Sequence, residues 1–367
     1  MSWAIWITGL PGSGKSVLAR AAASALHADD GPVRVLELDE IRKTLTPNPT
    51  YTDAERDVVY RTLAAMAVLL TEVGVPVIID ATAPQRRWRA LARAAIPRFA
   101  EVQLLCPLEV CRERERTRPQ GHAPRGIYAR AGQPGATVPG LDVPYEAALD
   151  PELLIDTSKE SLADGAARIV ALTRSLDSAR RDATHRRGDG WAMWITGRPG
   201  SGKTTLTAHL VDTLAARDIP VKVLDLATVR RFLLDDHTLS PGQHEIVHRA
   251  LVHLAKLLTE VGVAVIVDAT APRRSWRDAA RTEIHRFAEV QLVCPTEICV
   301  ERERASRWGL GAEWHHAAEH GAAGPNIEMD YEESFKPDLV VHTHLHDPWS
   351  AVEHVMFLVH RLRRSVP

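Results

Sequence analysis

The sequence predicts an α/β fold that is built twice, as two domains that each contain a mostly parallel sheet with helices on both faces. The first observation is an internal repeat: Trp3 to Ser16 reads WAIWITGLPGSGKS, and Trp191 to Thr204 reads WAMWITGRPGSGKT, at an offset of 188 residues from position 3 to position 191. The second is the alternation of short apolar runs with helical stretches, which is typical of parallel βαβ units. A chain of 367 residues is long enough for two such domains.

In the first half, the apolar runs and the stretches between them predict the elements in order. Short runs rich in Val, Ile and Leu predict strands at residues 5–8, 33–38, 75–80 and 101–106. The longer stretches between them predict helices at residues 15–26, 53–73 and 85–95. The second half repeats this order, since residues 72–84 (EVGVPVIIDATAP) return as residues 260–272 (EVGVAVIVDATAP). The two copies diverge mainly after Arg116 and Arg304.

The join between the copies is polar and charged. It reads SARRDATHRRGDG and lacks any apolar periodicity, which is typical of a linker. We therefore expect a first domain over residues 1–177, a linker over 178–190 and a second domain over 191–367.

Composition excludes several classes of protein. With 45 Lys and Arg against 47 Asp and Glu, and with 45% hydrophobic residues, the chain is neither disordered nor a basic protein that coats nucleic acid. Apolar runs such as Val75 to Ile79 are far shorter than the roughly 20 residues that cross a bilayer. No membrane span is expected, and the absence of a basic region before the first glycine motif favours a cytoplasmic location.

The four cysteines stand at equivalent positions of the two copies. Cys106 and Cys111 in the first copy correspond to Cys294 and Cys299 in the second. Their spacing is wider than that of the usual zinc ligand pairs, and cytosolic chains seldom keep disulfides. We expect them to be buried as small apolar residues.

A glycine-rich phosphate-binding motif follows the first predicted strand of each copy and opens a helix. In the first copy the motif comprises Gly9, Leu10, Pro11, Gly12, Ser13, Gly14, Lys15 and Ser16. In the second copy its fixed positions are Gly197, Gly200, Ser201, Gly202, Lys203 and Thr204. The pattern G-x-x-x-x-G-K-[ST] lets backbone N–H groups surround phosphates, while the lysine reaches the terminal phosphates and the hydroxyl binds Mg²⁺. ATP and Mg²⁺ are the expected ligands, and the fold is of the P-loop NTPase type.

Two carboxylates follow apolar strands of the first copy, where ligands of parallel sheets bind. Asp39 follows the second strand and is itself followed by Arg42. Asp39 has the chemistry to accept a proton from a substrate hydroxyl or to hold magnesium, and Arg42 has the chemistry to bind an anion; the alternative is that Asp39 only caps a helix. Asp80 ends the third strand and is a candidate magnesium ligand, with a turn or capping role as the alternative; Asp268 is its counterpart.

The first half resembles the adenylylsulfate kinases, which phosphorylate the 3′-hydroxyl of adenosine 5′-phosphosulfate with MgATP. The family pattern Leu-Asp-Gly-Asp-x-x-Arg resembles residues 36–42, and Phe-Ser-x-x-Asp-Arg-x-x-Asn-x-Arg resembles residues 51–61. Pro-Leu-x-x-Cys-Glu-x-Arg-Asp is similar to residues 107–115, and Lys-Gly-Leu-Tyr to residues 125–128. The resemblance covers essentially the whole first half.

The resemblance implies a role for each matching residue. Asp39 is expected to be the catalytic base, assisted by Lys15, and Arg114 to help bind ATP. The expected substrate-binding residues are Arg42, Arg56, Arg61, Arg125 and Ile127. The expected metal site comprises Ser16, Asp39 and Asp80. The family also implies a small nucleotide-like substrate, and an intramolecular pseudo-dimer or a homo-oligomer.

The chain departs from the family pattern at contacts that bear on the acceptor. Val59 replaces the asparagine of the second motif, Arg125 replaces a lysine, and residues 82–85 read TAPQ where the family has Ile-Ser-Pro-Tyr. Sites that hydrogen-bond a polar group discriminate strongly by that contact. The acceptor therefore stays open between adenosine 5′-phosphosulfate, a related metabolite and another hydroxyl, including a nucleic-acid end; a non-catalytic ATP-binding regulator is the further alternative.

The second copy departs further. Ala227 stands where Asp39 stands in the first copy, and alanine neither takes a proton nor binds metal. The second copy is therefore expected to bind nucleotide through its complete loop but to be degenerate as a kinase, unless its chemistry has moved to Asp225 or Asp268.

A histidine cluster lies near the end of the second copy. His315, His316 and His320 have spacings that suit a metal site on one helix face. The alternative is a solvated variant of the segment that covers the active site, and a chain with 17 histidines makes chance clusters common.

Overall fold

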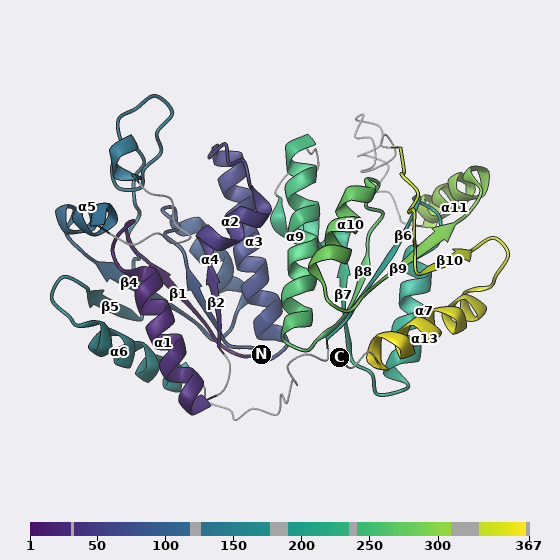
Figure 1. Cartoon of the computed structure of the whole chain (residues 1–367), viewed down its shortest axis with the longest axis horizontal. Helices are drawn as coiled ribbons and strands as arrows, with labels where there is room; N and C mark the ends of the chain where they lie inside the picture. Colours follow the sequence, from purple (N-terminus) through teal and green to yellow (C-terminus); the bar gives the residue numbers. More distant parts are fainter. Residues whose placement is uncertain (31–32, 118–125, 177–189, 235–240, 310–329, 365–367) are drawn as a thin grey trace. The chain divides into compact units, whose positions relative to one another are not determined.

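The computed structural model describes residues 1–30, 33–117, 126–176, 190–234, 241–309 and 330–364 (Figure 1). The chain divides into two compact units, one carried by each half, and each unit holds one five-stranded sheet.

The sheet of the first unit has the strand order β2-β3-β1-β4-β5, and all its strand pairs are parallel. The strands are β1 (Ala4–Thr8), β2 (Arg34–Glu37), β3 (Val77–Asp80), β4 (Phe99–Leu105) and β5 (Leu153–Asp156). Every residue of β1 and β3 is buried, as expected of parallel strands covered on both faces. The register pairs Glu37 with Asp80, so the carboxyl ends of β2 and β3 place two carboxylates side by side.

Helices cover both faces of this sheet. They are α1 (Lys15–Asp30), α2 (Leu38–Leu45), α3 (Asp53–Glu72), α4 (Arg86–Ala95), α5 (Leu108–Thr117), the 3₁₀ turn η1 (Tyr128–Arg130) and α6 (Leu162–Leu176). Helices α1 and α6 pack together over a core that includes Ile5, Ile7, Leu18 and Ile169 (Figure 1). Helices α3 and α4 pack together and contact β3 and β4, respectively. The sheet is therefore enclosed between two helix layers.

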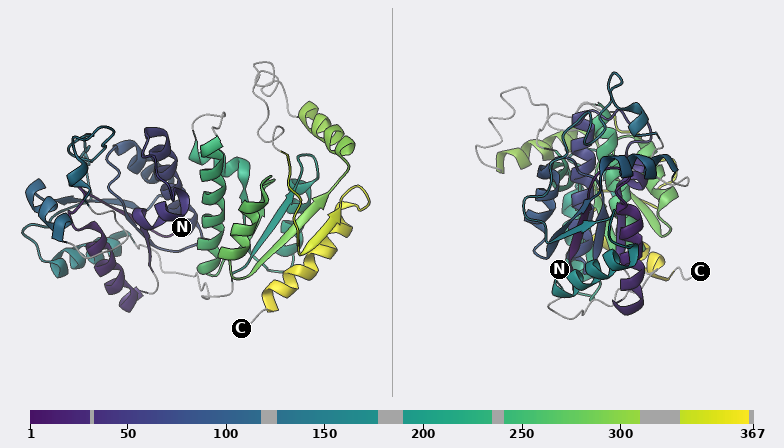
Figure 2. Two further views of the ribbon diagram at one scale, coloured as in Figure 1. Left: turned by 45° about the horizontal axis from the view of Figure 1, so that its top comes forward. Right: turned by 90° about the vertical axis from the view of Figure 1, so that its left-hand side faces the viewer.

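The second unit repeats this architecture. Its strands, in the order β7-β8-β6-β9-β10, are β6 (Ala192–Gly197), β7 (Val221–Asp225), β8 (Ala264–Asp268), β9 (Phe287–Val293) and β10 (Leu339–His342). Its helices are α7 (Lys203–Ala215), α8 (Leu226–Leu233), α9 (Pro241–Glu260), α10 (Arg274–Glu283), α11 (Thr296–Gly309) and α13 (Pro348–Arg364). Helix α13 packs on α7, and α9 packs on α10 (Figure 2). The predicted fold class is confirmed for both halves.

A buried arginine joins the layers in each unit. Arg89 of α4 is 1% exposed, and it donates hydrogen bonds to Glu101 of β4 and to the backbone carbonyls of Ala83 and Glu146. Arg277 makes the corresponding bonds in the second unit. Because a buried charge is tolerated only when it is paired and hydrogen-bonded, this network fixes the segment that follows β3.

The remaining expectations on the fold have mixed outcomes. The four cysteines are free thiols, three of them buried and Cys106 partly buried, as expected. In the described part of the chain, no helix combines the length and apolar character needed to cross a membrane. Residues 178–189 of the expected linker and the cluster of His315, His316 and His320 lie outside the described residues.

Candidate active site

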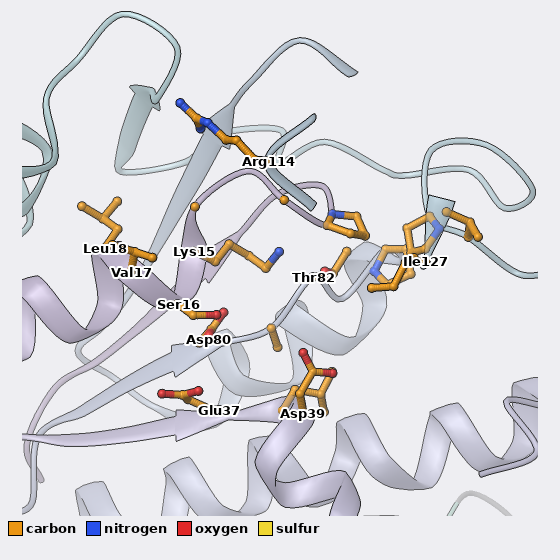
Figure 3. Close-up of a pocket in the computed structure, with 18 of the residues that line it drawn as sticks. Lys15, Ser16, Val17, Leu18, Glu37, Asp39, Asp80, Thr82, Arg114 and Ile127 are labelled. Carbon is orange, nitrogen blue, oxygen red and sulfur yellow. The ribbon is translucent and has the colours of Figure 1, made fainter. Parts of the chain in front are cut away.

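A cavity of about 850 Å³ opens at the carboxyl ends of the strands of the first unit (Figure 3). Of the residues expected at the site from the sequence, it is lined by Pro11, Gly12, Gly14, Lys15, Ser16, Asp39, Arg42, Arg56, Asp80, Arg114 and Ile127. Residues more than one hundred positions apart in the sequence therefore meet in one place. Most of the residues that the sequence predicts at the site therefore line one cavity.

The loop between β1 and α1 has the shape of a phosphate cradle. Gly12 and Gly14 have φ angles of 78° and 96°, in the left-handed region that favours glycine. A Cβ atom at Gly12 would collide with the carbonyl oxygen of Cys111, so the loop is packed directly against α5. Lys15 Nζ lies over the loop and donates to the carbonyl oxygens of Gly9 at 3.1 Å and Leu10 at 3.0 Å. The Lys15 side chain thus folds back over the loop.

Oxygen donors suited to magnesium lie beside this loop. Figure 3 shows Ser16 against Asp80, with Glu37 and Asp39 on the same side of the cavity. Burial raises the pKa of the Asp80 carboxyl above its ordinary value, although the Lys15 charge and a hydrogen bond from Ser16 oppose the rise. Among the described residues no three His, Cys, Asp or Glu side chains form a complete metal cage. This fits Mg²⁺, which typically takes one or two protein ligands together with phosphate oxygens and water.

Asp39 lines the cavity near the start of α2. It is the second residue of α2, and the residue at the N-cap is Glu37, whose side chain makes no capping hydrogen bond. Among the described residues no hydrogen bond or ion pair engages the Asp39 carboxylate. Its lining position, between the phosphate loop and the arginines of α2 and α3, leaves the carboxylate open to the cavity.

Arg42 is held by the N-terminal turn of α3. Its Nη1 donates to Glu55 Oε1 at 3.3 Å, and its guanidinium lies 5.3 Å from the centre of the Tyr51 ring. Glu55 also accepts hydrogen bonds from the Thr50 backbone N–H and hydroxyl, both at 2.7 Å, and from the Tyr51 backbone N–H at 3.2 Å. Burial acts to raise the pKa of Glu55, but these hydrogen bonds and the Arg42 charge bring it below its ordinary value. Glu55 is therefore an ionised positioning residue.

Arg56 directly follows Glu55 on α3 and also lines the cavity. Its Nη2 donates to the Thr137 carbonyl oxygen at 3.0 Å and to the Thr137 hydroxyl. Burial lowers the pKa of Arg56, although an arginine remains charged at neutral pH. The neighbouring Tyr60 stacks on Trp88 with ring centres 4.2 Å apart. The site thus presents a positive side formed by Arg42 and Arg56 opposite the phosphate loop.

Arg114 of α5 also lines the cavity, and it is hydrogen-bonded to the segment that follows β5. Its Nη2 donates to the Thr157 carbonyl oxygen at 2.7 Å, and its Nη1 donates to the Thr157 hydroxyl at 3.1 Å. The Thr157 hydroxyl in turn donates to the Ser13 carbonyl oxygen at 2.9 Å. Arg114 therefore stands next to the phosphate loop, as expected of a residue that helps bind ATP.

Of the expected substrate-binding residues, Arg61 is not brought to the cavity, and Arg125 is not described. Arg61 is not among its lining residues, because its Nε is bound to Asp57 Oδ2 at 2.7 Å on the same helix. Arg125 lies outside the described residues. The sequence reasoning in turn missed Glu55 and Tyr60. Glu55 carries a readable signal, since Thr52 and Glu55 form the S/T-x-x-E pattern and the Thr52 hydroxyl accepts from the Glu55 N–H.

The second unit keeps the phosphate loop but not the counterpart of Asp39. Lys203 Nζ donates to the carbonyl oxygens of Gly197 and Arg198, both at 3.1 Å. Burial raises the pKa of Asp268, opposed by a hydrogen bond from Thr204, just as at Asp80 and Ser16. The Asp225 carboxylate caps α8. It accepts hydrogen bonds from the backbone N–H groups of Ala227 and Thr228, both at 3.0 Å.

Kinases with such a loop hold ATP by its phosphates and transfer its terminal phosphoryl group to an acceptor bound nearby. This chain is a P-loop phosphotransferase that acts on an alcohol group. More specifically, it belongs to the adenylylsulphate kinase family, whose model matches residues 1–156 and again residues 189–342. The two matches also confirm the tandem repeat.

Three relatives each match a length close to that of one copy. A probable adenylyl-sulfate kinase of Archaeoglobus fulgidus is 38% identical over 162 residues, which are 43% of this chain and 98% of the relative. An adenylyl-sulfate kinase of Gloeothece citriformis is 36% identical over 168 residues, or 45% of this chain and 90% of the relative. The solved structure of the Mycobacterium tuberculosis APS kinase CysC in complex with AMPPNP and APS is 30% identical, with a TM-score of 0.42, and covers 47% of this chain and 98% of its own.

Proposed function

We propose that the first unit transfers the γ-phosphate of ATP to the 3′-hydroxyl of adenosine 5′-phosphosulfate. We also propose that residues 1–177 form the catalytic domain, that 178–190 link it to the second, and that 191–367 form a copy that binds nucleotide without transferring phosphate. The observation that carries the proposal is the position of Asp39, in one cavity with the phosphate loop and with Arg42 and Arg56. The relatives named adenylyl-sulfate kinase support the choice of acceptor.

The ATP side of the mechanism uses the phosphate loop. The backbone N–H groups of the loop and the α1 N-terminus surround the phosphates, and Lys15 exchanges its bonds to the loop carbonyls for bonds to phosphate oxygens. Ser16 and Asp80 are the residues that would hold Mg²⁺, which when bound neutralises charge on the phosphate oxygens. Arg114 stands beside the loop and screens the same charge.

The acceptor side uses Asp39 and the arginines. Arg42 and Arg56 bind the anionic end of the acceptor and so fix its hydroxyl near Asp39. The Asp39 carboxylate accepts the hydroxyl proton as the acceptor oxygen bonds to the γ-phosphorus, and the bond from that phosphorus to ADP breaks, with ADP as the leaving group. In phosphoryl transfer most of the rate comes from such positioning and from charge stabilisation. The fixed position of Arg42, held by Glu55, is therefore part of the mechanism.

Substitution of Asp39 tests the assignment. Asp39→Ala is expected to lower kcat by about 10² to 10⁴, because the proton acceptor is lost, while ATP binding stays nearly unchanged. Turnover is measured by coupled ADP release, and ATP binding by calorimetry. Asp39→Asn, which keeps the size of the side chain, should show a similar loss. An unchanged kcat in both variants would remove Asp39 from the mechanism.

An acceptor panel tests the substrate. Labelled ATP is incubated with adenosine 5′-phosphosulfate, nucleoside diphosphate conjugates and 5′-hydroxyl oligonucleotides. Label on adenosine 5′-phosphosulfate alone supports the proposal. Label on another acceptor would replace the substrate but keep the kinase, and label on none, with ATP bound, would favour a regulatory ATP-binding protein.

A further inference from the structure

Tyr60 of α3 is a buried polar residue of the cavity for which the mechanism above has no use. It lines the cavity and is 5% exposed, and its ring stacks on Trp88. In the family pattern Asn-x-Arg it stands at the variable position, between Val59 and Arg61. A polar side chain buried in the cavity wall at a variable position is a candidate for a property particular to this chain.

The Tyr60 hydroxyl uses a lone pair but not its hydrogen. The Ala83 backbone N–H donates to the hydroxyl oxygen at 3.2 Å. In the described part of the chain, no atom accepts the hydroxyl hydrogen in return. Burial raises the pKa of Tyr60 above its ordinary 10, although the charges of Arg42 and Arg56 oppose the rise, so the hydroxyl keeps its proton at neutral pH. Because a buried donor without an acceptor is costly, this hydrogen is available to a ligand in the cavity.

The second copy shows that the backbone around Ala83 does not need this hydroxyl. His248 stands at the position of Tyr60, and its ring stacks on the equivalent tryptophan with ring centres 3.6 Å apart. Ala271, the counterpart of Ala83, nevertheless has the same φ angle of 39°. In both units the carbonyl oxygen of this alanine accepts a hydrogen bond from the buried arginine described above. The hydroxyl is therefore dispensable for the local fold, which leaves a contact with a ligand as its use.

The groups around the hydroxyl indicate the kind of ligand atom that it meets. Arg42 and Arg56 line the same cavity, and both lie close enough to Tyr60 to act electrostatically on its phenol. Two guanidinium groups and a phenol hydroxyl are all hydrogen-bond donors, and such a set suits an anionic oxygen. The Asp39 carboxylate, in contrast, suits the alcohol end of the acceptor, because it accepts a proton.

We propose that Tyr60 is a substrate-binding residue whose hydroxyl donates a hydrogen bond to an oxygen of the acceptor's anionic group, beside Arg42 and Arg56. The proposal rests on the function proposed above for the first unit. In this chain the hydroxyl adds a neutral donor next to Val59, the position at which the asparagine of the family pattern is lost. The second unit does not make this contact, because His248 has no hydroxyl.

Steady-state kinetics of Tyr60→Phe in the full chain tests this inference. The substitution removes the hydroxyl and keeps the stacked ring. We expect KM for adenosine 5′-phosphosulfate to rise about ten-fold, while kcat and KM for ATP stay within a few-fold. AMP and adenosine are also compared as inhibitors against adenosine 5′-phosphosulfate. AMP keeps an anionic group and should inhibit about ten-fold more weakly in the variant, whereas adenosine, which lacks that group, should inhibit as before.

Two further variants complete the test. Tyr60→His introduces the residue that the second copy already accommodates at this place, so it should give the same result even if Tyr60→Phe fails to fold. His248→Phe is the matched control in the second unit and should change none of these constants. Equal weakening of AMP and adenosine, or unchanged inhibition by AMP in both variants of Tyr60, would overturn the inference. A wild-type protein that transfers no phosphate to adenosine 5′-phosphosulfate would overturn the proposed function, and this inference with it.

Discussion

At the scale of single residues, the two copies show which side chains the fold requires and which the chemistry requires. Asp39 and Ala227 are both the second residue of an eight-residue helix, α2 or α8, so the helix does not depend on the carboxylate. The lysine and the hydroxyl residue of the loop are kept in both copies, with the same contacts. The loss of the carboxylate in the second copy is therefore a change that the fold tolerates.

The ionised Asp80 carboxylate is expected to lower the free energy of unfolding, although the proposed reaction needs it to hold Mg²⁺. Burial raises the pKa of Asp80 in the folded protein above the ordinary 3.8. The stability that the protonated carboxyl contributes is therefore complete below pH 3.8, and it is lost as the pH rises through the raised pKa. Asp80→Asn should therefore raise the Tm of the metal-free protein at neutral pH, by an amount that grows with pH, while kcat falls by about 10²-fold or more. Calorimetric melting at a series of pH values checks this.

The second unit offers the matched control for Asp80. Burial also raises the pKa of Asp268, so Asp268→Asn should raise Tm in the same direction but leave turnover unchanged. A lower Tm for Asp80→Asn at neutral pH would show that the ionised carboxylate stabilises the folded state.

At the scale of elements, the N-terminal turn of α3 organises the acceptor side. Glu55 ties together the segment before α3 and Arg42 of α2, through one ion pair and three hydrogen bonds. The contact is not local, because it depends on α2 and α3 meeting at the cavity. Helix α3 thus positions the acceptor site as well as covering the sheet.

Glu55→Gln is expected to act on acceptor binding. A neutral amide loses the charge that holds Arg42 and accepts fewer of the three hydrogen bonds, so KM for the acceptor should rise about ten-fold while kcat changes less. Steady-state kinetics with varied acceptor measures the split. Glu113→Gln, which removes a fully exposed ion pair with Arg116 on α5, should change neither constant. A fall in kcat alone for Glu55→Gln would contradict the positioning role.

The elements differ in how far the sequence predicts them. Strand β1, the phosphate loop and α1 follow from a strong local pattern, and they lie within a few residues of the prediction. Helix α2 was not predicted, because its eight residues are shorter than the stretches that periodicity resolves. Contacts such as the Tyr128 hydroxyl with the Pro11 carbonyl oxygen join residues 117 positions apart, and only the folded chain reveals them. Likewise, Arg61 matches the family motif, yet the helix turns it toward Asp57.

At the scale of the whole molecule, the chain carries one phosphate-binding loop in each of two similar units. The units differ at the position of Asp39, which is Ala227 in the second. Lys15→Ala is expected to remove nearly all turnover, whereas Lys203→Ala should leave it within a few-fold, because only the first unit has a carboxylate at the acceptor. Each variant should also lose one of two ATP-binding events in calorimetry. Equal loss of turnover in the two variants would show that the second loop is obligatory for transfer.

The close packing of Gly12 on the carbonyl group of Cys111 has a mechanical consequence. No added carbon atom fits between them, so the phosphate loop and the first turn of α5 are in direct contact. Arg114 lies one turn further along the same helix. Any shift of the loop on phosphate binding is therefore expected to move α5, and Arg114 with it.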